Sequence, residues 1–152
     1  MPTKSVLFVC LGNICRSPTA DGVMRKLAAG QGITIDSCGT AGWHIGKSPD
    51  PRAVAEAASK GYDLTPMRAR QINQEDFAKF DLIIAMDQSK LNNINAIAPC
   101  GHNAELLKFT DLLPDTHPMR GQDVPDPYYE DNFPEVLELI EEGTAQLLKR
   151  LA

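Results

Sequence analysis

The segment that leads from residue 5 to Pro18 constrains the fold of this chain more than any other. Residues 5–9 (SVLFV) form an apolar run typical of a buried strand, and Ser17-Pro18 is typical of a helix start. Only the short stretch 10–16 (CLGNICR) separates the two. A strand that passes through a tight loop into a helix begins a β-α-β unit, so the sequence predicts a parallel sheet covered by helices.

The rest of the chain alternates strand-like and helix-like segments in the same way. Further strands are expected over residues 33–37, 81–85 and 105–110, and helices over residues 18–30, 51–60, 89–98 and from near Pro134 onward. Asn73 is expected to cap one more helix. The sequence therefore predicts a single α/β domain over residues 1–152, in three layers, with a four-stranded parallel sheet between helices on both faces.

Composition excludes several classes of protein. The net charge of −5 argues against a nucleic-acid-binding protein, which normally has a basic excess. No apolar run approaches the roughly 20 residues that a membrane span needs, and the N-terminus has no signal-peptide pattern. The four cysteines include no Cys-x-x-Cys pair, and the three histidines are far apart in sequence. We expect a cytoplasmic protein with reduced thiols, without metal or cofactor, that binds neither nucleic acid nor a membrane.

Cys10 and Arg16 stand at the two ends of the loop between the predicted strand and helix. Backbone N–H groups of such a loop point toward the helix N-terminus, where they bind anions and favour a thiolate over a thiol. The planar guanidinium of Arg16 can hold two oxygens of one phosphate. We therefore expect phosphate or another oxyanion in the loop, with Cys10 as a nucleophile toward phosphorus.

The other loop residues are expected to shape this phosphate cradle. Gly12 lets the backbone turn, and Asn13 tolerates left-handed dihedrals. Ser17 can donate a hydrogen bond to the thiolate or to the loop. The predicted phosphate-binding loop comprises Leu11, Gly12, Asn13, Ile14, Cys15 and Ser17 beside the two reactive residues.

A long polar loop after residue 110 offers the acid that phosphoryl transfer to water needs. Asp126 lies there between two prolines that restrict its backbone, and Tyr128 and Tyr129 follow it as possible walls for an aromatic substrate. By composition alone, Asp115 and Asp123 are equal candidates for the acid.

These motifs together resemble the low-molecular-weight protein tyrosine phosphatases. The stretches CLGNICRSP (residues 10–18) and DPYY (residues 126–129) are the most specific, and the likeness covers nearly the whole chain. The resemblance implies a Rossmann-like sheet of the phosphotyrosine protein phosphatase I type. It also implies hydrolysis of phosphotyrosine and small aryl phosphates, with a tyrosine-phosphorylated protein as partner and, by analogy, a bacterial tyrosine kinase among the substrates.

The same resemblance implies roles for individual residues. Cys10 matches the nucleophile that forms a cysteinyl-phosphate intermediate, Arg16 the arginine that binds the phosphate, and Asp126 the general acid. The positions that line the substrate cleft match Trp43, Tyr128 and Tyr129. In one respect the chain departs from the family: many members have a histidine that supports the loop asparagine where this chain has Met67, which cannot form such a hydrogen bond. We therefore expect a differently supported Asn13 and a less rigid loop.

Cys15 lies five residues from Cys10 in the same curled loop. A reactive thiolate oxidises readily to a sulfenic acid, which a neighbouring thiol can trap as a disulfide. The sequence thus suggests a reversible Cys10–Cys15 disulfide that protects the enzyme, against the alternative that Cys15 only packs beneath the loop.

Two other functions have related requirements. A thioredoxin-coupled arsenate reductase also has a Cys-x₅-Arg loop, but it needs two further cysteines that pass a disulfide outward, and residues 86–89 contain none. A non-catalytic phosphotyrosine-binding or redox module is expected to lack the nucleophile or the acid, and this chain has candidates for both.

Overall fold

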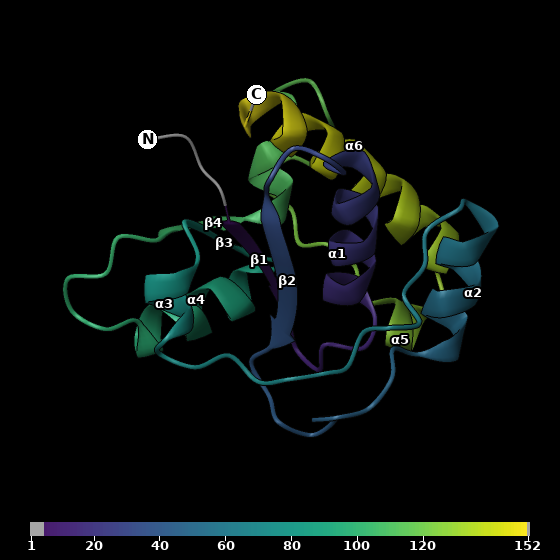
Figure 1. The fold of residues 1–152 in the computed structure, drawn as a ribbon. Helices are drawn as coiled ribbons and strands as arrows, with labels where there is room; N and C mark the ends of the chain where they lie inside the picture. The colour runs from purple at the N-terminus through teal and green to yellow at the C-terminus, as the bar shows by residue number, and fades with distance from the viewer. Residues whose placement is uncertain (1–4, 152) are drawn as a thin grey trace.

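Four parallel strands in the order β2-β1-β3-β4 form the centre of the computed structural model, which describes residues 5–151 (Figure 1). Strand β1 (Ser5–Cys10) lies between β2 (Thr34–Gly39) and β3 (Leu82–Ala85), and β4 (Glu105–Lys108) pairs with β3. Each connection passes through helical segments, as parallel pairing requires. The carboxyl ends of β1, β2 and β3 meet at one edge of the sheet, where α/β proteins build their sites.

Helices cover both faces of the sheet, which confirms the predicted three-layer α/β fold (Figure 1). Helices α1 (Arg16–Leu27), α2 (Pro51–Ser59) and α6 (Phe133–Leu151) lie on one side, and α3 (Asp76–Lys79) and α4 (Gln88–Ile97) on the other. Along β1, Val6 and Phe8 belong to the first apolar core, whereas Leu7 and Val9 belong to the second. A strand buried on both faces needs this unbroken apolar run.

Most element boundaries differ from the predictions by one to three residues. The first helix begins at Arg16, so this side chain lies in its first turn. The last strand ends at Lys108 and continues as a 3₁₀ turn, Phe109–Leu112. The expected Asn73 cap was wrong: α3 begins at Asp76, whose carboxylate instead accepts the Asn73 N–H at 2.9 Å. The short helix α5 (Pro127–Glu130) was not anticipated, because a single turn has no apolar periodicity.

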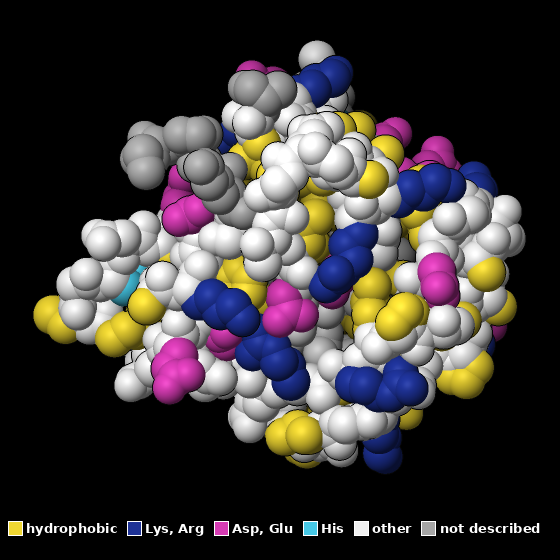
Figure 2. All heavy atoms as spheres, in the orientation of Figure 1, with side chains coloured by type: hydrophobic (Ala, Val, Ile, Leu, Met, Phe, Trp, Pro, Cys, Tyr) yellow, Lys and Arg dark blue, Asp and Glu magenta, His cyan; other side chains and the backbone are white. Residues whose placement is uncertain are grey.

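The surface in Figure 2 has basic and acidic side chains interspersed with apolar ones. Within residues 5–151, no helix is both long and apolar enough to cross a membrane. The same part of the chain contains no cluster of three histidine, cysteine or acidic side chains that could hold a metal ion.

Candidate active site

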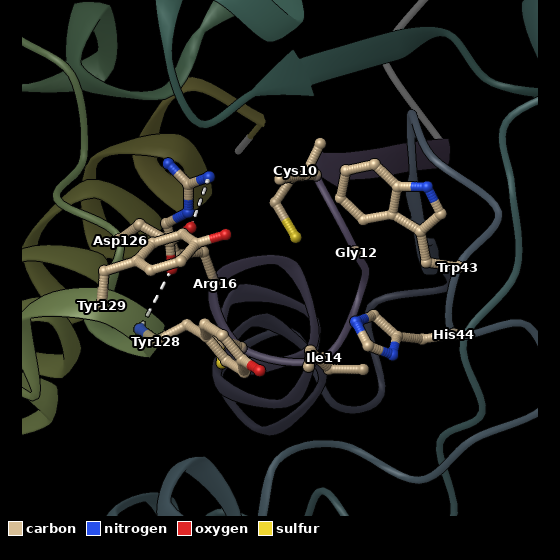
Figure 3. Close-up of a pocket in the computed structure, with 11 residues that line it drawn as sticks. Cys10, Gly12, Ile14, Arg16, Trp43, His44, Asp126, Tyr128 and Tyr129 are labelled. Atoms are coloured by element: carbon tan, nitrogen blue, oxygen red, sulfur yellow. Dashed lines mark hydrogen bonds and ion pairs between the residues drawn. The ribbon is translucent and has the colours of Figure 1, made fainter.

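A pocket of about 150 Å³ opens above the loop between β1 and α1 (Figure 3). Figure 3 shows the Cys10 sulfur at its centre, with the Trp43 and His44 rings on one side and Asp126 with the two tyrosines on the other. The predicted residues that line it are Cys10, Leu11, Gly12, Ile14, Cys15, Arg16, Trp43, Asp126, Tyr128 and Tyr129. The structure therefore brings together residues that are more than a hundred positions apart in sequence.

Asn13 stabilises the conformation of the loop through its backbone and its buried side chain. It has a left-handed backbone with φ of 59°, and its side chain is buried. The side-chain amide donates to Ser17 Oγ (2.8 Å) and to Ser37 Oγ (3.1 Å), and Oδ1 accepts the backbone N–H of Arg70 (3.0 Å). These bonds use both donor hydrogens and the carbonyl oxygen, so they hold the left-handed conformation in place.

The support for Asn13 thus comes from the backbone of Arg70 and from two serines, not from residue 67. Met67 packs against the apolar core instead. The Arg70 side chain is itself held by Asp36 (3.1 Å) and by a two-pronged pair with Asp76 (both 3.0 Å). The structure therefore shows what supports Asn13 in this chain, whereas the difference from other family members and the reduced rigidity of the loop stay predictions.

Close packing explains the glycines at this edge. Gly12 does not have a positive φ, and a Cβ there would lie 2.8 Å from the His44 ring, so a larger residue would require this ring to move. Gly39, which sequence reasoning did not single out, ends β2 against the loop, and a Cβ on it would lie 2.6 Å from the Leu11 carbonyl oxygen. Both positions let the backbone and rings approach within contact distance.

The Cys10 sulfur lies at the end of β1 with little exposure and faces the Ser17 hydroxyl at 3.0 Å. Ser17 Oγ is also 3.2 Å from the Cys38 carbonyl oxygen. A hydroxyl has a single proton to donate, and the Ser17 oxygen already accepts a hydrogen bond from the Asn13 amide. Ser17 can therefore give its proton to a Cys10 thiolate, or to the Cys38 carbonyl when Cys10 is a thiol.

Arg16 is buried and fixed by three groups. Its Nη1 donates to Asp87 Oδ2 and to the Val124 carbonyl, both at 2.9 Å, and its Nη2 lies 3.6 Å from Asp126 Oδ2. Burial alone would lower the pKa of the guanidinium, but the negative charges at Cys10, Asp126 and Asp87 outweigh it and raise that pKa. The guanidinium therefore stays charged and keeps one orientation toward the pocket.

Asp87 and His44 belong to the site although sequence reasoning did not select them. Asp87 caps α4, where its Oδ1 accepts the Lys90 N–H. Its position two residues after β3, at the carboxyl edge of a parallel sheet, was the available signal. His44 lines the pocket beside Trp43, and its place in the same turn-rich loop was the only hint.

The structure separates the three acid candidates. Asp126 lines the pocket and caps α5, with Oδ1 accepting the Tyr128 N–H at 3.1 Å. Asp115 pairs with Arg120 on the surface. Asp123 accepts the N–H of Gln88 and does not line the pocket. Only Asp126 of the three is therefore placed to reach a group above Cys10.

Exposed aromatic rings form the rim. Trp43 is 68% exposed and Tyr129 73% exposed, and the Tyr128 and Tyr129 rings meet edge to face with centroids 5.1 Å apart. Exposed aromatic side chains that gather around one pocket form an apolar surface of the kind that marks binding sites, so the rim is suited to a flat aromatic group.

Cys15 lies at the start of α1, buried against the wall of the pocket. Burial, followed by the negative charge of Asp50, raises the pKa of this thiol well above its usual range. Cys15 is thus a neutral thiol, and in the structure all four cysteines are unpaired.

Comparison with known proteins gives a consistent result. The sequence model of the family described as low molecular weight phosphotyrosine protein phosphatase matches residues 5–152. The chain is 43% identical to the low molecular weight protein-tyrosine-phosphatase YfkJ of Bacillus subtilis over 148 residues. This alignment covers 95% of this chain and 93% of that protein. It is 46% identical over 135 residues to the low molecular weight phosphotyrosine protein phosphatase of Sus scrofa, covering 84% and 81% respectively.

Solved structures of similar proteins have the same fold as this chain. The crystal structure of YfkJ from Bacillus subtilis superposes with a TM-score of 0.89 at 40% identity, over 98% of this chain and 94% of that one. Wzb of Vibrio vulnificus, solved in complex with benzylphosphonate, has a TM-score of 0.85 at 28% identity, over 98% and 99%. With its pocket, its loop and these matches, the chain belongs to the low molecular weight phosphotyrosine protein phosphatase family.

Proposed function

We propose that this protein hydrolyses phosphotyrosine in proteins, and small aryl phosphates, through a cysteinyl-phosphate intermediate. The observation that carries the proposal is the convergence of Cys10, Arg16 and Asp126 on one pocket with an aromatic rim. The residues that line the pocket lie at or beyond the carboxyl ends of strands of one sheet, which supports a single phosphatase domain.

In the first step the Cys10 thiolate attacks phosphorus and the bond from phosphorus to the phenolic oxygen breaks. The protonated Asp126 gives its proton to that oxygen, so a neutral phenol leaves. Arg16 and the loop N–H groups hold the equatorial oxygens, on which negative charge is spread in the transition state.

In the second step water displaces the sulfur. The Asp126 carboxylate removes a proton from the water, whose oxygen bonds to phosphorus as the sulfur–phosphorus bond breaks. Inorganic phosphate and the Cys10 thiolate result, and Asp126 is protonated again for the next substrate.

The test of this mechanism is direct detection of the intermediate. Acid quench of a reaction with phosphotyrosine peptide, followed by mass spectrometry, is expected to find a phosphoryl group on the peptide that contains Cys10. Turnover without any phosphorylated cysteine would refute the covalent route, and an absence of turnover would refute the activity itself.

The Asp126→Ala variant is expected to lose kcat/KM in a manner that depends on the leaving group. General acid catalysis contributes about 10²–10⁴-fold, and most where the departing oxygen is a strong base. Phenyl phosphate should therefore slow much more than p-nitrophenyl phosphate. Equal slowing of both substrates would remove Asp126 as the acid, and Asp115→Ala, a substitution at the exposed surface, is the control.

The proposed partner is a tyrosine-phosphorylated protein, with a bacterial tyrosine kinase as one such substrate. The aromatic rim supports an aryl phosphate over an alkyl one, and the family relative Wzb has been solved with benzylphosphonate. We place the protein in the cytoplasm, because this chemistry needs reduced thiols and the cysteines are unpaired. No cysteine relay of the arsenate-reductase kind supports the rival function, since Cys38 is buried and Cys100 lies outside the pocket.

Peroxide inactivation is expected to be reversible in the wild type and much less so in Cys15→Ser. Peroxide converts the Cys10 thiolate to a sulfenic acid and is itself reduced; the Cys15 thiol then forms the disulfide and water leaves. Because the pKa of Cys15 is raised, its thiolate fraction, and with it the rate of disulfide formation, should increase about tenfold per pH unit between pH 6 and 8. Recovery with dithiol after a prolonged exposure measures the protection. Equal recovery of both proteins would contradict it.

A further inference from the structure

Lys108 is a buried cation that the proposed mechanism does not use. It ends β4 and is only 7% exposed. Its Nζ donates to the Gly121 carbonyl at 2.7 Å and pairs with Asp123 Oδ1 at 3.1 Å. Removing an ammonium group from water is costly, and it is tolerated when the charge is paired and its hydrogens are used. Both partners of Lys108 lie in the segment that leads to Asp126.

Residues 121–124 are the last anchored part of the chain before Asp126. Residues 113–126 contain no helix or strand, so isolated turn bonds and tertiary bonds fix their path. The Asp123 carboxylate joins two elements, because the atom that pairs with Lys108 also accepts the Gln88 N–H (2.9 Å) at the start of α4. Other bonds to residues 121–124 join Gln122 to Thr110 and Met119, and Val124 to Met86 and Arg16.

The direction in which the chain reaches Asp126 depends on the points at which the preceding residues are held. Met86 and Arg16 hold Val124, two residues before Asp126. Lys108 holds the chain at Gly121 and Asp123, on the far side of Val124 from the acid. Thr110 and the Gln88 N–H also hold this stretch, at Gln122 and Asp123. Without Lys108 two of the anchors before Val124 are lost, so the stretch gains freedom and the Asp126 carboxyl moves relative to Cys10.

We propose that Lys108 is a positioning residue for the general acid: its ammonium, by holding Gly121 and Asp123, sets the place of the Asp126 carboxyl above Cys10. The inference rests on the proposed function, since it gives Lys108 this task only if Asp126 protonates the leaving oxygen. It also predicts a specific defect, because only steps that use Asp126 should suffer.

Lys108→Met removes the ammonium and keeps most of the side-chain volume. Because misplacement of a catalytic group by about 1 Å costs up to about 100-fold, we expect kcat/KM for phenyl phosphate to fall about tenfold or more. The value for p-nitrophenyl phosphate should fall less than about threefold, since its leaving group needs less help from an acid. Lys26→Met is the matched control: Lys26 also donates to a glycine carbonyl, that of Gly61, but it lies outside the pocket and should leave both rates unchanged.

The Asp126→Ala background separates positioning from general damage. If Lys108 acts through Asp126, adding Lys108→Met to Asp126→Ala causes no further loss of kcat/KM. A loss that multiplies with that of Asp126→Ala, or an equal loss for both substrates, would overturn the proposal. If Asp126→Ala itself has no effect, the acid assignment fails, and that result is distinct from a failure of the Lys108 proposal.

A second variant keeps the proposal testable if Lys108→Met folds poorly. Asp123→Asn weakens the ion pair but keeps an oxygen for the Gln88 N–H, and it should show the same dependence on leaving group at a smaller size. The rate at which iodoacetate alkylates Cys10 should stay within about twofold of wild type in both variants, because the cradle does not include these residues. Slower alkylation together with uniform slowing of turnover would assign Lys108 a structural role only.

Discussion

Replacing Cys10 with serine is expected to abolish turnover of phosphotyrosine while leaving its binding intact. A serine hydroxyl near neutral pH is a far weaker nucleophile than a thiolate, so the covalent step should slow by at least about 10⁴-fold. The phosphate cradle is otherwise unchanged, because Ser and Cys differ by one atom and Ser17 can bond either. Hydrolysis of p-nitrophenyl phosphate and calorimetric binding of a phosphotyrosine peptide measure the two effects separately.

The control for this substitution is Cys100→Ser. Cys100 is exposed in a loop outside the pocket, and its replacement should leave kcat and KM unchanged. Residual turnover of Cys10→Ser above about 1% of wild type would show that the sulfur is not the nucleophile. The binding-competent, inactive variant is also the reagent with which to capture phosphoprotein substrates from cells.

Arg16→Lys is expected to lower kcat by about 10³-fold, although the positive charge is kept. A guanidinium donates in a fork that matches two phosphate oxygens, whereas an ammonium is a point charge. The wild-type fork is oriented by Asp87 and by the Val124 carbonyl, both at 2.9 Å, and a shorter side chain cannot keep these bonds and reach the phosphate. The loss should therefore appear in kcat more than in KM.

Urea unfolding provides a second measurement for Arg16→Lys. A buried Asp87 carboxylate left without its full set of partners should cost about 1–3 kcal/mol of stability. The matched control is Arg52→Lys, because Arg52 contacts the Tyr128 ring and Asp50 at the rim but does not line the pocket. Arg52→Lys should keep kcat within about threefold of wild type, since no fork to phosphate is lost. A fall of less than tenfold in Arg16→Lys would mean that charge alone, without the fork, suffices for phosphate.

The layers of the fold and the phosphate-binding loop at the base of the pocket were predictable because they depend on local sequence. Periodic apolar residues define the strands and helices, and the loop that connects β1 to α1 holds Cys10 and Arg16 within one turn of a helix start. Asp126 was less well determined: three aspartates of one loop were equivalent by composition, and only the family resemblance favoured Asp126, which the fold then places at the pocket.

What sequence reasoning missed depends on contacts between distant segments. Asp87 meets Arg16 across 71 positions and Lys108 meets Gly121 across a loop, and no periodicity encodes either pair. The donor to the Asn13 side-chain oxygen was equally unpredictable. Arg70 donates through its backbone N–H, which does not depend on the type of residue at that position. Such contacts follow from the register of the sheet and the packing of loops, which only the folded chain defines.

The bond from the Arg70 N–H to Asn13 limits which substitutions can disturb the cradle. Every residue except proline carries a backbone N–H, so no ordinary replacement at position 70 deletes this donor. A side-chain donor at position 67 would be lost with a single substitution, and Met67 shows that the chain does without one. Asn13 therefore places no hydrogen-bonding demand on residue 67, whereas proline at 70 should be among the few changes near this loop that no neighbouring side chain can compensate.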